Sequence, residues 1–458
     1  MASPLAGEWV REPAVAGRFY TDDPVRLRDV VQRHLGEGVG SAPGPPPAAL
    51  IAPHAGYRYS GPTAGAGWAT LASGETSPDR IVLLGPSHRV PVGGSGVGVS
   101  SASAWRTPLG EVPLDRAAAD TLVDDGLAVV ADDAHAPEHS LEVHLPFLLE
   151  ALGPVPVVPL VTGRCPAEAA AAALRRLWSD EGTVVVVSSD LSHYLPEPEA
   201  RARDDRTLEA VVEGRVDDIG PEDACGRIAV GGLLLAARSH GIAPSLVAVA
   251  TSADTSGDAD RVVGYASIAF TTPPPLTDGE RAWLVERARA ALVHEVATGE
   301  PDPLDDAEVP ARLRLLGASF VTLRRTGRLT GCIGSLEACR PLWRDVVHNA
   351  RAAAFEDPRF APVAPEDLPD LGVKVSVLSA TEPLPGERDA LAALLRPGVD
   401  GVLIEAEGQR GTFLPSVWEA VPSTDRFLAA LLTKAGLPDD DWPAGLRAAR
   451  YTTDEFGD

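Results

Sequence analysis

Three consecutive prolines place the strongest constraint on how this chain of 458 residues folds. They stand at 273–275, in the stretch TTPPPL, and such a run cannot continue a helix or a central strand. A chain of this length also exceeds the size at which one hydrophobic core stops growing. We therefore predict a first domain at residues 1–272, a proline-rich linker at 273–279 and a second domain at 280–458.

The first domain alternates between two kinds of segment. Short apolar, β-branched runs at 49–52, 80–84, 155–160 and 183–188 are typical of strands buried on both faces, and 261–270 predicts a closing strand. Helical patterns such as 167–178 lie between them. This alternation predicts an α/β domain with a central mixed sheet, in which functional sites gather at the loops that leave strand ends.

The second domain mixes helices and strands in another order. Thr277 and Glu280 have the spacing of a capping box for a helix at 281–297. Strands are predicted at 319–323, 329–334 and 373–378, and an amphipathic helix at 343–355. We expect a smaller α+β domain.

Composition excludes several classes of protein. The net charge of −25 argues against a nucleic-acid partner, and four cysteines are too few for a disulfide framework of this length. No apolar run is long enough for a membrane helix, and the first ten residues have neither a basic start nor an apolar stretch. We expect a cytoplasmic protein with no membrane partner, and the Ala-, Gly- and Pro-rich usage indicates a bacterial source.

Histidines concentrate in the first domain, at the ends of predicted strands. His54, His88, His135, His139 and His193 each adjoin a turn that presents an imidazole at the sheet edge. Imidazoles gathered at one rim are what a metal site or a general acid–base site requires, whereas a single histidine after a strand is usually structural.

Other interpretations apply to four histidines, one of which, His139, also belongs to the group above. We expect His34 and His240 at the surface. The helical register of residues 138–146 leaves two roles open for His139 and His144, which either hold a helix end or bind substrate.

Six blocks of sequence resemble the signature blocks of the Memo family and occur in that family's order. They are AVAGRFY at 14–20, APHAGYRYSGP at 52–62, LGPSH at 84–88, EHSLEVHLPF at 138–147, SSDLSHY at 188–194 and VVGY at 262–265. The resemblance implies a fold similar to that of the class III extradiol dioxygenases, which are non-haem iron enzymes.

The same resemblance implies a metal site. Its ligands map to His54, His88 and Cys225, while Asp190 and His193 line the pocket as candidate catalytic residues. The candidate substrate-pocket residues are Tyr57, His139 and His144. Two imidazoles and a thiolate suit iron or copper, with zinc possible, and three protein ligands leave a position open for a small-molecule substrate.

The second domain resembles the AMMECR-type domain. The matching blocks are GASFVTL at 317–323, LTGCIG at 329–334, NARAAA at 349–354, DPRF at 357–360, VSVL at 375–378, GTFLPSV at 411–417 and KAGL at 434–437. Cys332 is either a reactive thiol between two glycines or a small residue in a tight turn. Chains that join these domains resemble the AmmeMemoRadiSam group, which implies a radical S-adenosylmethionine (SAM) protein as partner.

These observations lead to three hypotheses. The first is a metal-dependent, dioxygenase-like oxidoreductase in which His193 and Asp190 move a proton beside the open position. The second is a protein that binds, stores or delivers iron or copper, or acts as a scaffold, without catalysis. The third is a zinc- or His/Asp-dependent hydrolase.

Overall fold

The computed structural model describes residues 9–38, 46–74, 77–94, 96–178, 182–238, 240–303, 308–438 and 442–458. Residues 1–8, which are most of the ten residues that lack a basic start and an apolar stretch, lie outside these ranges. The chain divides into two compact units between Pro273 and Pro274, within the triple proline, and the short segment Arg238–Gly241 groups with the second unit. Among the described helices, none combines the length and the apolar character needed to cross a membrane.

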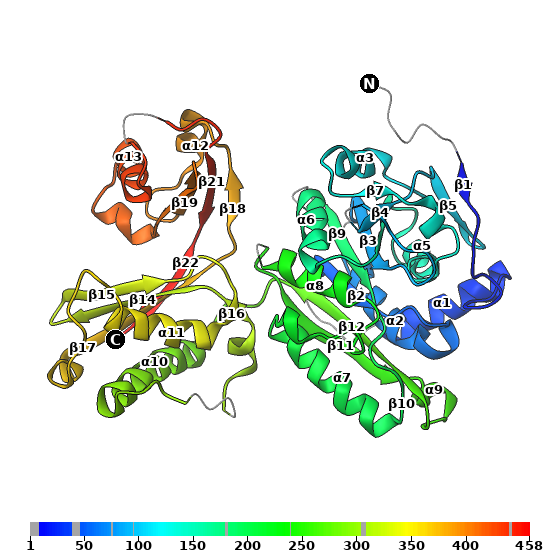
Figure 1. The fold of residues 1–458 in the computed structure, drawn as a ribbon, viewed down its shortest axis with the longest axis horizontal. Helices are drawn as coiled ribbons and strands as arrows, with labels where there is room; N and C mark the ends of the chain where they lie inside the picture. The colour runs from blue at the N-terminus through cyan, green and yellow to red at the C-terminus, as the bar shows by residue number, and fades with distance from the viewer. Residues whose placement is uncertain are drawn as a thin grey trace. The chain divides into compact units, whose positions relative to one another are not determined.

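A nine-stranded mixed sheet forms the centre of the first unit (Figure 1). Parallel strands occupy its middle, in the order β2 (Ala49–Ala52), β9 (Thr183–Ser188), β3 (Arg80–Pro86) and β8 (Val157–Thr162). The antiparallel strand β12 (Val262–Thr271) adjoins β2, and β4 (Val97–Val99) adjoins β8. The outer strands are β10 (His193–Leu195), β11 (Ala243–Thr251) and β7 (Val129–Val130). The predicted central mixed sheet is confirmed.

Helices cover both faces of this sheet, because successive side chains of each central strand point to opposite sides. In β2, Leu50 packs with α1 (Pro24–Gly38), α2 (Tyr57–Ala72) and α5 (Leu145–Leu152), whereas Ile51 packs in the core on the other face. That second core includes α6 (Ala167–Trp178), α7 (Glu197–Val212) and α8 (Arg227–Ala237). The first unit is therefore a three-layer α/β/α arrangement.

The parallel strands also fix where the site can form. Strands β2, β9 and β3 are neighbours and run in the same direction, so the segments after Ala52, Ser188 and Pro86 leave the sheet at one edge. A short sheet of β1 (Val10–Arg11), β5 (Ala104–Thr107) and β6 (Gly110–Pro113) lies elsewhere in this unit.

The second unit begins with α10 (Asp278–Thr298), and the predicted capping box between Thr277 and Glu280 is present. The helix starts two residues before the predicted domain start, because Asp278 and Gly279 already belong to its first turn. With α11 (Leu342–Phe355), it packs on an antiparallel sheet in the order β15 (Arg328–Gly334), β14 (Ser319–Arg325), β17 (Leu371–Leu378) and β22 (Thr453–Gly457) (Figure 1).

A second lobe of this unit has its own core. Its antiparallel sheet has the order β18 (Glu382–Leu384), β21 (Arg447–Tyr451), β19 (Gly401–Ala406) and β20 (Gln409–Phe413), and α12 (Arg388–Leu394) and α13 (Thr424–Ala435) contribute to its core. The sequence predicted none of these four strands. The final strands β21 and β22 follow each other directly and join the two lobes.

The predicted surface position of His34 is wrong. The side chain is buried in α1, where Gly61 and Gly65 of α2 leave room for it: a Cβ on either glycine would lie 2.7 Å or less from a His34 atom. Burial lowers the pKa of His34. His240 is partly exposed.

Candidate metal centre

Three histidines from distant parts of the sequence meet at the edge where the parallel strands end. His54 follows β2, His88 follows β3, and His139 lies between the short helix α4 (Asp132–His135) and the 3₁₀ turn η1 (Glu142–His144). One ring nitrogen of each lies within 4.8 Å of the others. The ring centroids are 5.2 Å apart for His54 and His88, 5.4 Å for His54 and His139, and 4.8 Å for His88 and His139.

A cysteine lies beside one member of this group, His54, although the ligand atoms that all lie within 4.8 Å of one another are those of the three histidines alone. The Sγ of Cys225 lies 3.3 Å from His54 Nε2 and accepts a hydrogen bond of 3.3 Å from the backbone N–H of Asp190. Cys225 stands in the turn before α8, and its approach depends on Gly226, because a Cβ there would lie 2.6 Å from the carbonyl oxygen of Ser188. Burial and the neighbouring Asp190 raise the pKa of the Cys225 thiol.

A buried carboxylate holds two of the histidines. Glu138 Oε2 accepts the backbone N–H of His88 at 2.6 Å, and Oε1 lies 2.9 Å from His88 Nδ1. The same Oε1 accepts the backbone N–H groups of His139 and Ser140 at 3.0 Å. Burial alone would raise the pKa of Glu138, but the adjacent side chains of His139 and His88 outweigh it and hold the pKa well below its usual value. Glu138 is therefore ionised, and it takes the Nδ1–H of His88 so that Nε2 is left to bind a ligand.

The ring of His139 is held less tightly. Its Nδ1 lies 3.0 Å from Glu138 Oε1, but the two atoms are too poorly aligned for a hydrogen bond, and that buried Nδ1 has no other partner in the described part of the chain. Phe19 packs against the ring with a centroid distance of 4.6 Å. An under-bonded imidazole nitrogen beside two others is a feature that a metal ion would explain.

Two buried polar side chains, Ser188 and His144, lie behind the ring of His54. Its Nδ1 lies 2.6 Å from Ser188 Oγ, and that oxygen lies 3.0 Å from Nε2 of His144. Burial, followed by the neighbouring His88, lowers the pKa of His54, and burial lowers that of His144 to about 3. Both imidazoles are therefore neutral at neutral pH, which is the form that binds metals.

The predicted catalytic pair lies beside this group. Asp190 is buried, and its Oδ1 accepts the backbone N–H of His54 at 2.7 Å. Burial raises the pKa of Asp190, although the His54 hydrogen bond and the nearby His193 oppose the shift. His193 is partly exposed, and its Nδ1 lies 2.9 Å from the carbonyl oxygen of Leu191, so its Nε2 can face solvent or substrate.

Two predicted substrate-pocket residues use their polar atoms within the protein. The hydroxyl of Tyr57 donates to the carbonyl oxygen of Val143 at 2.6 Å, and His144 bonds Ser188 and Trp68. The third, His139, joins the metal-type cluster. His135, expected at the same rim, instead packs against Trp105 and bonds the carbonyl oxygen of Gly98 at 3.1 Å.

Glu138 and Ser188 received no role from the sequence. A signal existed for each: Glu138 is an acid directly before a candidate histidine, and Ser188 ends an otherwise apolar strand. The nearby Glu142 forms a buried ion pair with Arg11 at 2.7 Å and pins the chain before α1 to this region.

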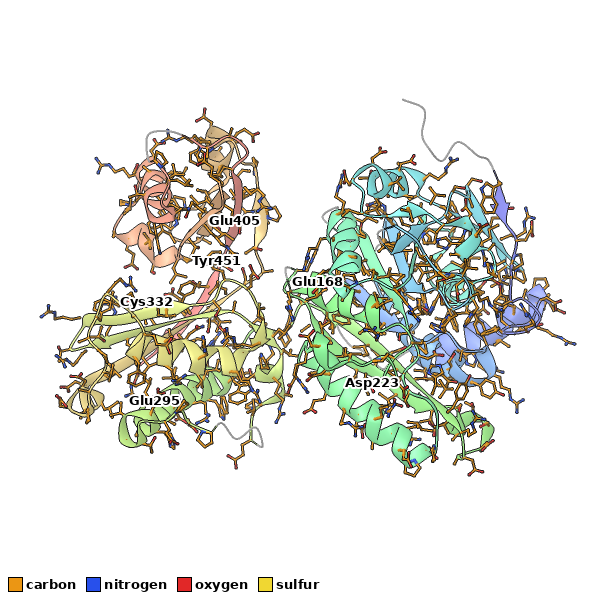
Figure 2. All side chains as sticks on the ribbon, viewed as in Figure 1. Glu168, Asp223, Glu295, Cys332, Glu405 and Tyr451 are labelled. Atoms are coloured by element: carbon orange, nitrogen blue, oxygen red, sulfur yellow. The ribbon has the colours of Figure 1, made fainter. Side chains whose placement is uncertain are left out.

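The thiol of the second unit lies in a different setting. Figure 2 labels Cys332 on the first sheet of that unit and Tyr451 on the second. The Sγ of Cys332 accepts a hydrogen bond from Thr322 at 3.4 Å, and its backbone N–H donates to Asp357 at 2.9 Å. Arg359 donates to the Cys332 carbonyl oxygen at 2.8 Å and pairs with Asp357.

Comparison with known proteins agrees with this division of the chain. The family model for Memo-like proteins matches residues 11–269, and the model named AMMECR1 matches residues 285–456. A MEMO1 family protein of Methanopyrus kandleri is 39% identical over an alignment of 286 positions, and this alignment covers 57% of this chain and 98% of the relative. A MEMO1 family protein of Sulfolobus acidocaldarius is 37% identical over 57% of this chain and 99% of the relative.

A solved structure also matches part of the chain. An uncharacterized protein from Pyrococcus horikoshii is 31% identical and aligns with 40% of this chain and 93% of its own, with a TM-score of 0.38. Both of the MEMO1 family relatives named above are archaeal, and the bacterial source expected from composition stays a prediction.

Proposed function

We propose that the first unit of this chain, which belongs to the Memo-like protein family through residues 11–269, holds a metal and is a redox enzyme. The second unit carries an AMMECR1 domain at residues 285–456. The observation that carries the proposal is the meeting of three imidazoles within 4.8 Å, next to the Cys225 thiol. We assign His54, His88 and Cys225 as ligands. We add His139, which the sequence had placed in the substrate pocket.

The donor set narrows the choice of metal. Imidazole nitrogens with one thiolate form a borderline-to-soft set that suits iron(II), copper or zinc better than magnesium or calcium. The neutral state of His54 and the Nδ1–H···Glu138 bond of His88 each leave one nitrogen lone pair for coordination. We propose iron or copper as the resident metal, because a fold like that of the extradiol dioxygenases, which the family resemblance implies, is associated with redox chemistry.

The chain's own groups would supply proton transfer and orientation. A bound metal would supply Lewis acidity or one-electron chemistry. Asp190 holds the backbone at His54 and faces Cys225, so it fixes the two sides of the centre relative to each other. His193 hydrogen-bonds through Nδ1 and keeps Nε2 available to hold or move a proton of a substrate at the rim.

The wider setting of the reaction rests on the sequence resemblance. We propose that the protein works in the cytoplasm with a radical SAM protein and a small-molecule substrate. The AMMECR1 domain would act in the same process, since the two domains share one chain.

A non-catalytic metal-binding role is the second candidate. It is favoured by the exposure of one candidate ligand: His54 is buried and His139 is half-buried, but His88 is exposed, so a metal ion could enter and leave the cluster from solvent. The two roles differ in turnover: an enzyme consumes dioxygen or a co-substrate when loaded with metal, whereas a storage or delivery protein binds tightly and consumes nothing. The hydrolase hypothesis predicts cleavage of generic esters by the zinc-loaded protein.

Metal analysis of protein purified without oxygen tests the site. We expect stoichiometric iron or copper in the wild type and its loss in His54→Ala, His88→Ala and Cys225→Ala, with a smaller loss in His139→Ala. His294→Ala, a histidine of the other unit, is the matched control and should retain the metal. If the wild-type protein holds no stoichiometric metal even after reconstitution with iron or copper, the assignment is overturned.

A further inference from the structure

A chain of buried hydrogen bonds leads from the first core to the candidate ligand His54. Trp68 Nε1 donates to His144 Nδ1 at 3.2 Å, His144 Nε2 lies 3.0 Å from Ser188 Oγ, and Ser188 Oγ lies 2.6 Å from His54 Nδ1. All four side chains are buried, and burial lowers the pKa of both imidazoles, so none of the four side chains is charged at neutral pH. The Ser188 hydroxyl also donates to the carbonyl oxygen of Ser140 at 2.6 Å.

Hydrogen counting around Ser188 fixes the direction of these bonds. Three polar atoms lie within 3.0 Å of its oxygen, and each contact needs one hydrogen, but a hydroxyl has only one to give. The carbonyl oxygen of Ser140 carries no hydrogen, so the hydroxyl must donate there. His54 and His144 must therefore each donate an N–H to the two lone pairs of Ser188 Oγ.

The other end of the chain reaches the same answer independently. The indole N–H of Trp68 can only donate, so Nδ1 of His144 must accept. A neutral imidazole carries one N–H, and in His144 it therefore lies on Nε2, pointing to Ser188. The two ends of the network agree without leaving a buried donor or acceptor unpaired.

We propose that Ser188 and His144 are positioning residues that hold His54 in the tautomer with its proton on Nδ1. This leaves the Nε2 lone pair of His54 directed at Cys225 Sγ, 3.3 Å away. In the metal-free protein the Cys225 thiol donates its hydrogen to that nitrogen, and the same nitrogen and sulfur are the atoms that would hold a metal ion. The tautomer follows from the network alone, whereas its consequence for metal binding rests on the proposed function.

The two best-held histidines are thus oriented by different chemistry. His88 donates its Nδ1–H to the Glu138 carboxylate, whereas His54 donates to a neutral hydroxyl. A carboxylate at the position of Ser188 would lie close to Asp190, which is buried and whose pKa burial already raises. The hydroxyl therefore fixes the ring of His54 without adding a second buried charge on that side of the centre.

Nitrogen-15 NMR of the imidazoles in metal-free full-length protein tests the tautomer directly. We expect His54 to be protonated on Nδ1 and His144 on Nε2 in the wild type. In Ser188→Ala the His54 proton loses its acceptor, so we expect a mixture of the two tautomers. A wild-type His54 protonated on Nε2 would overturn the proposal, whether or not the protein binds a metal.

A matched pair of variants separates positioning from packing. In His144→Gln, the amide nitrogen can take the place of the ring Nε2 and donate to Ser188, whereas His144→Phe keeps a ring of similar size without any donor. We expect His144→Phe and Ser188→Ala to lose metal affinity by about 10- to 100-fold and His144→Gln to keep most of it. Equal losses in the Gln and Phe variants, with an unchanged His54 tautomer in both, would reduce His144 to a packing residue and overturn its assigned role.

If the tautomer is as assigned but the wild type binds no metal, the proposed function fails and this inference stands.

Discussion

Removing the charge of Glu138 is the sharpest test of how the centre is held. In Glu138→Gln the side chain keeps its length, but only one carbonyl oxygen remains. That oxygen can serve the position of Oε1, which accepts from His88 Nδ1 and from the backbone of His139 and Ser140. The new NH₂ group then faces the backbone N–H of His88, which Oε2 accepts at 2.6 Å in the wild type.

The size of the effect follows from these bonds. A hydrogen bond to a charged group contributes about 1.5–3 kcal/mol and a neutral one about 0.5–1.5 kcal/mol. The bond that orients the His88 imidazole is therefore weakened by about 1 kcal/mol. The opposed N–H groups at His88 add a further penalty. We expect metal affinity to fall by about 10- to 100-fold, equivalent to about 1.4–2.7 kcal/mol.

Competition with a chromophoric chelator measures this affinity, and Glu142→Gln is the matched control. Glu142 is also a buried carboxylate, with hydrogen bonds from the backbone of Ala14 and Val15 and an ion pair with Arg11, but no candidate ligand contacts it. Breaking its ion pair should lower the free energy of unfolding by about 3–5 kcal/mol while the folded protein keeps its metal affinity. Equal affinities in Glu138→Gln and the wild type would refute the role given to Glu138.

Three further predictions concern stability and the close approaches around the two thiols. Burial lowers the pKa of His135 to about 4 and that of His144 to about 3, whereas the pKa in the unfolded chain is about 6.5. Below pH 6.5 the unfolded chain therefore binds more protons than the folded protein. In urea unfolding, we expect the free energy of unfolding to be at its full value above pH 6.5 and to fall by up to about 1.4 kcal/mol per histidine for each pH unit below it. A flat profile between pH 7 and 5 would contradict this. Gly226→Ala should displace Cys225 and abolish metal binding, because the new Cβ would lie 2.6 Å from the carbonyl oxygen of Ser188. The control is Gly36→Ala in α1, where the new Cβ meets open space and should raise the free energy of unfolding by about 0.5–1 kcal/mol. Metal content and thermal melts compare the two variants. The hydrogen bond from Arg359 lowers the pKa of Asp357 to about 2, so the stability that this pair gives is lost as the pH falls from about 4 to 2. Asp357 also accepts the backbone N–H of Cys332, so Asp357→Asn should speed alkylation of Cys332 relative to that of the exposed Cys339. Unchanged labelling rates by mass spectrometry would count against this role of Asp357.

Strands buried on both faces were the easiest elements to predict. The runs at 49–52 and 183–188 form β2 and β9 with the predicted bounds, and helix α6 also occupies its predicted range. These segments are unbroken apolar runs or strong helical patterns, bounded by residues that stop them. Their local preference and their burial agree, so tertiary structure did not shift their ends.

Edge strands and the second lobe were harder for a physical reason. Strand β10 has only three residues, and its partner β12 pairs with it across a register shift at His193 and Leu195. Such a strand owes its form to the neighbouring strand, because only Tyr194 of its three residues is of a type that favours strands, and that residue has a φ of 60°. In the second lobe, β20 reads QRGTF, whose exposed polar start and internal glycine lack an alternating apolar pattern.

The metal-type cluster shows what a linear sequence hides. His54 and His88 were predictable together, because parallel neighbouring strands end at the same edge. His139 comes from a loop that no strand order specifies, so its place beside them depends on how residues 131–144 fold over the sheet edge. Sequence reasoning gave it a neighbouring role and could not supply the 4.8 Å separation.

The polar residues that support the candidate ligands left one signal in the sequence. Strand β9 begins at Thr183, continues through four valines and ends in Ser188, which Ser189 and Asp190 follow; all of these residues except the half-buried Val184 are buried. A buried hydroxyl costs free energy unless it is hydrogen-bonded, so polar residues at the end of an apolar central strand must have partners nearby. Here the partners are the carbonyl oxygen of Ser140 and the imidazoles of His54 and His144. A polar end on a strand buried on both faces therefore predicts the groups that orient a site, even where the ligands themselves come from other loops.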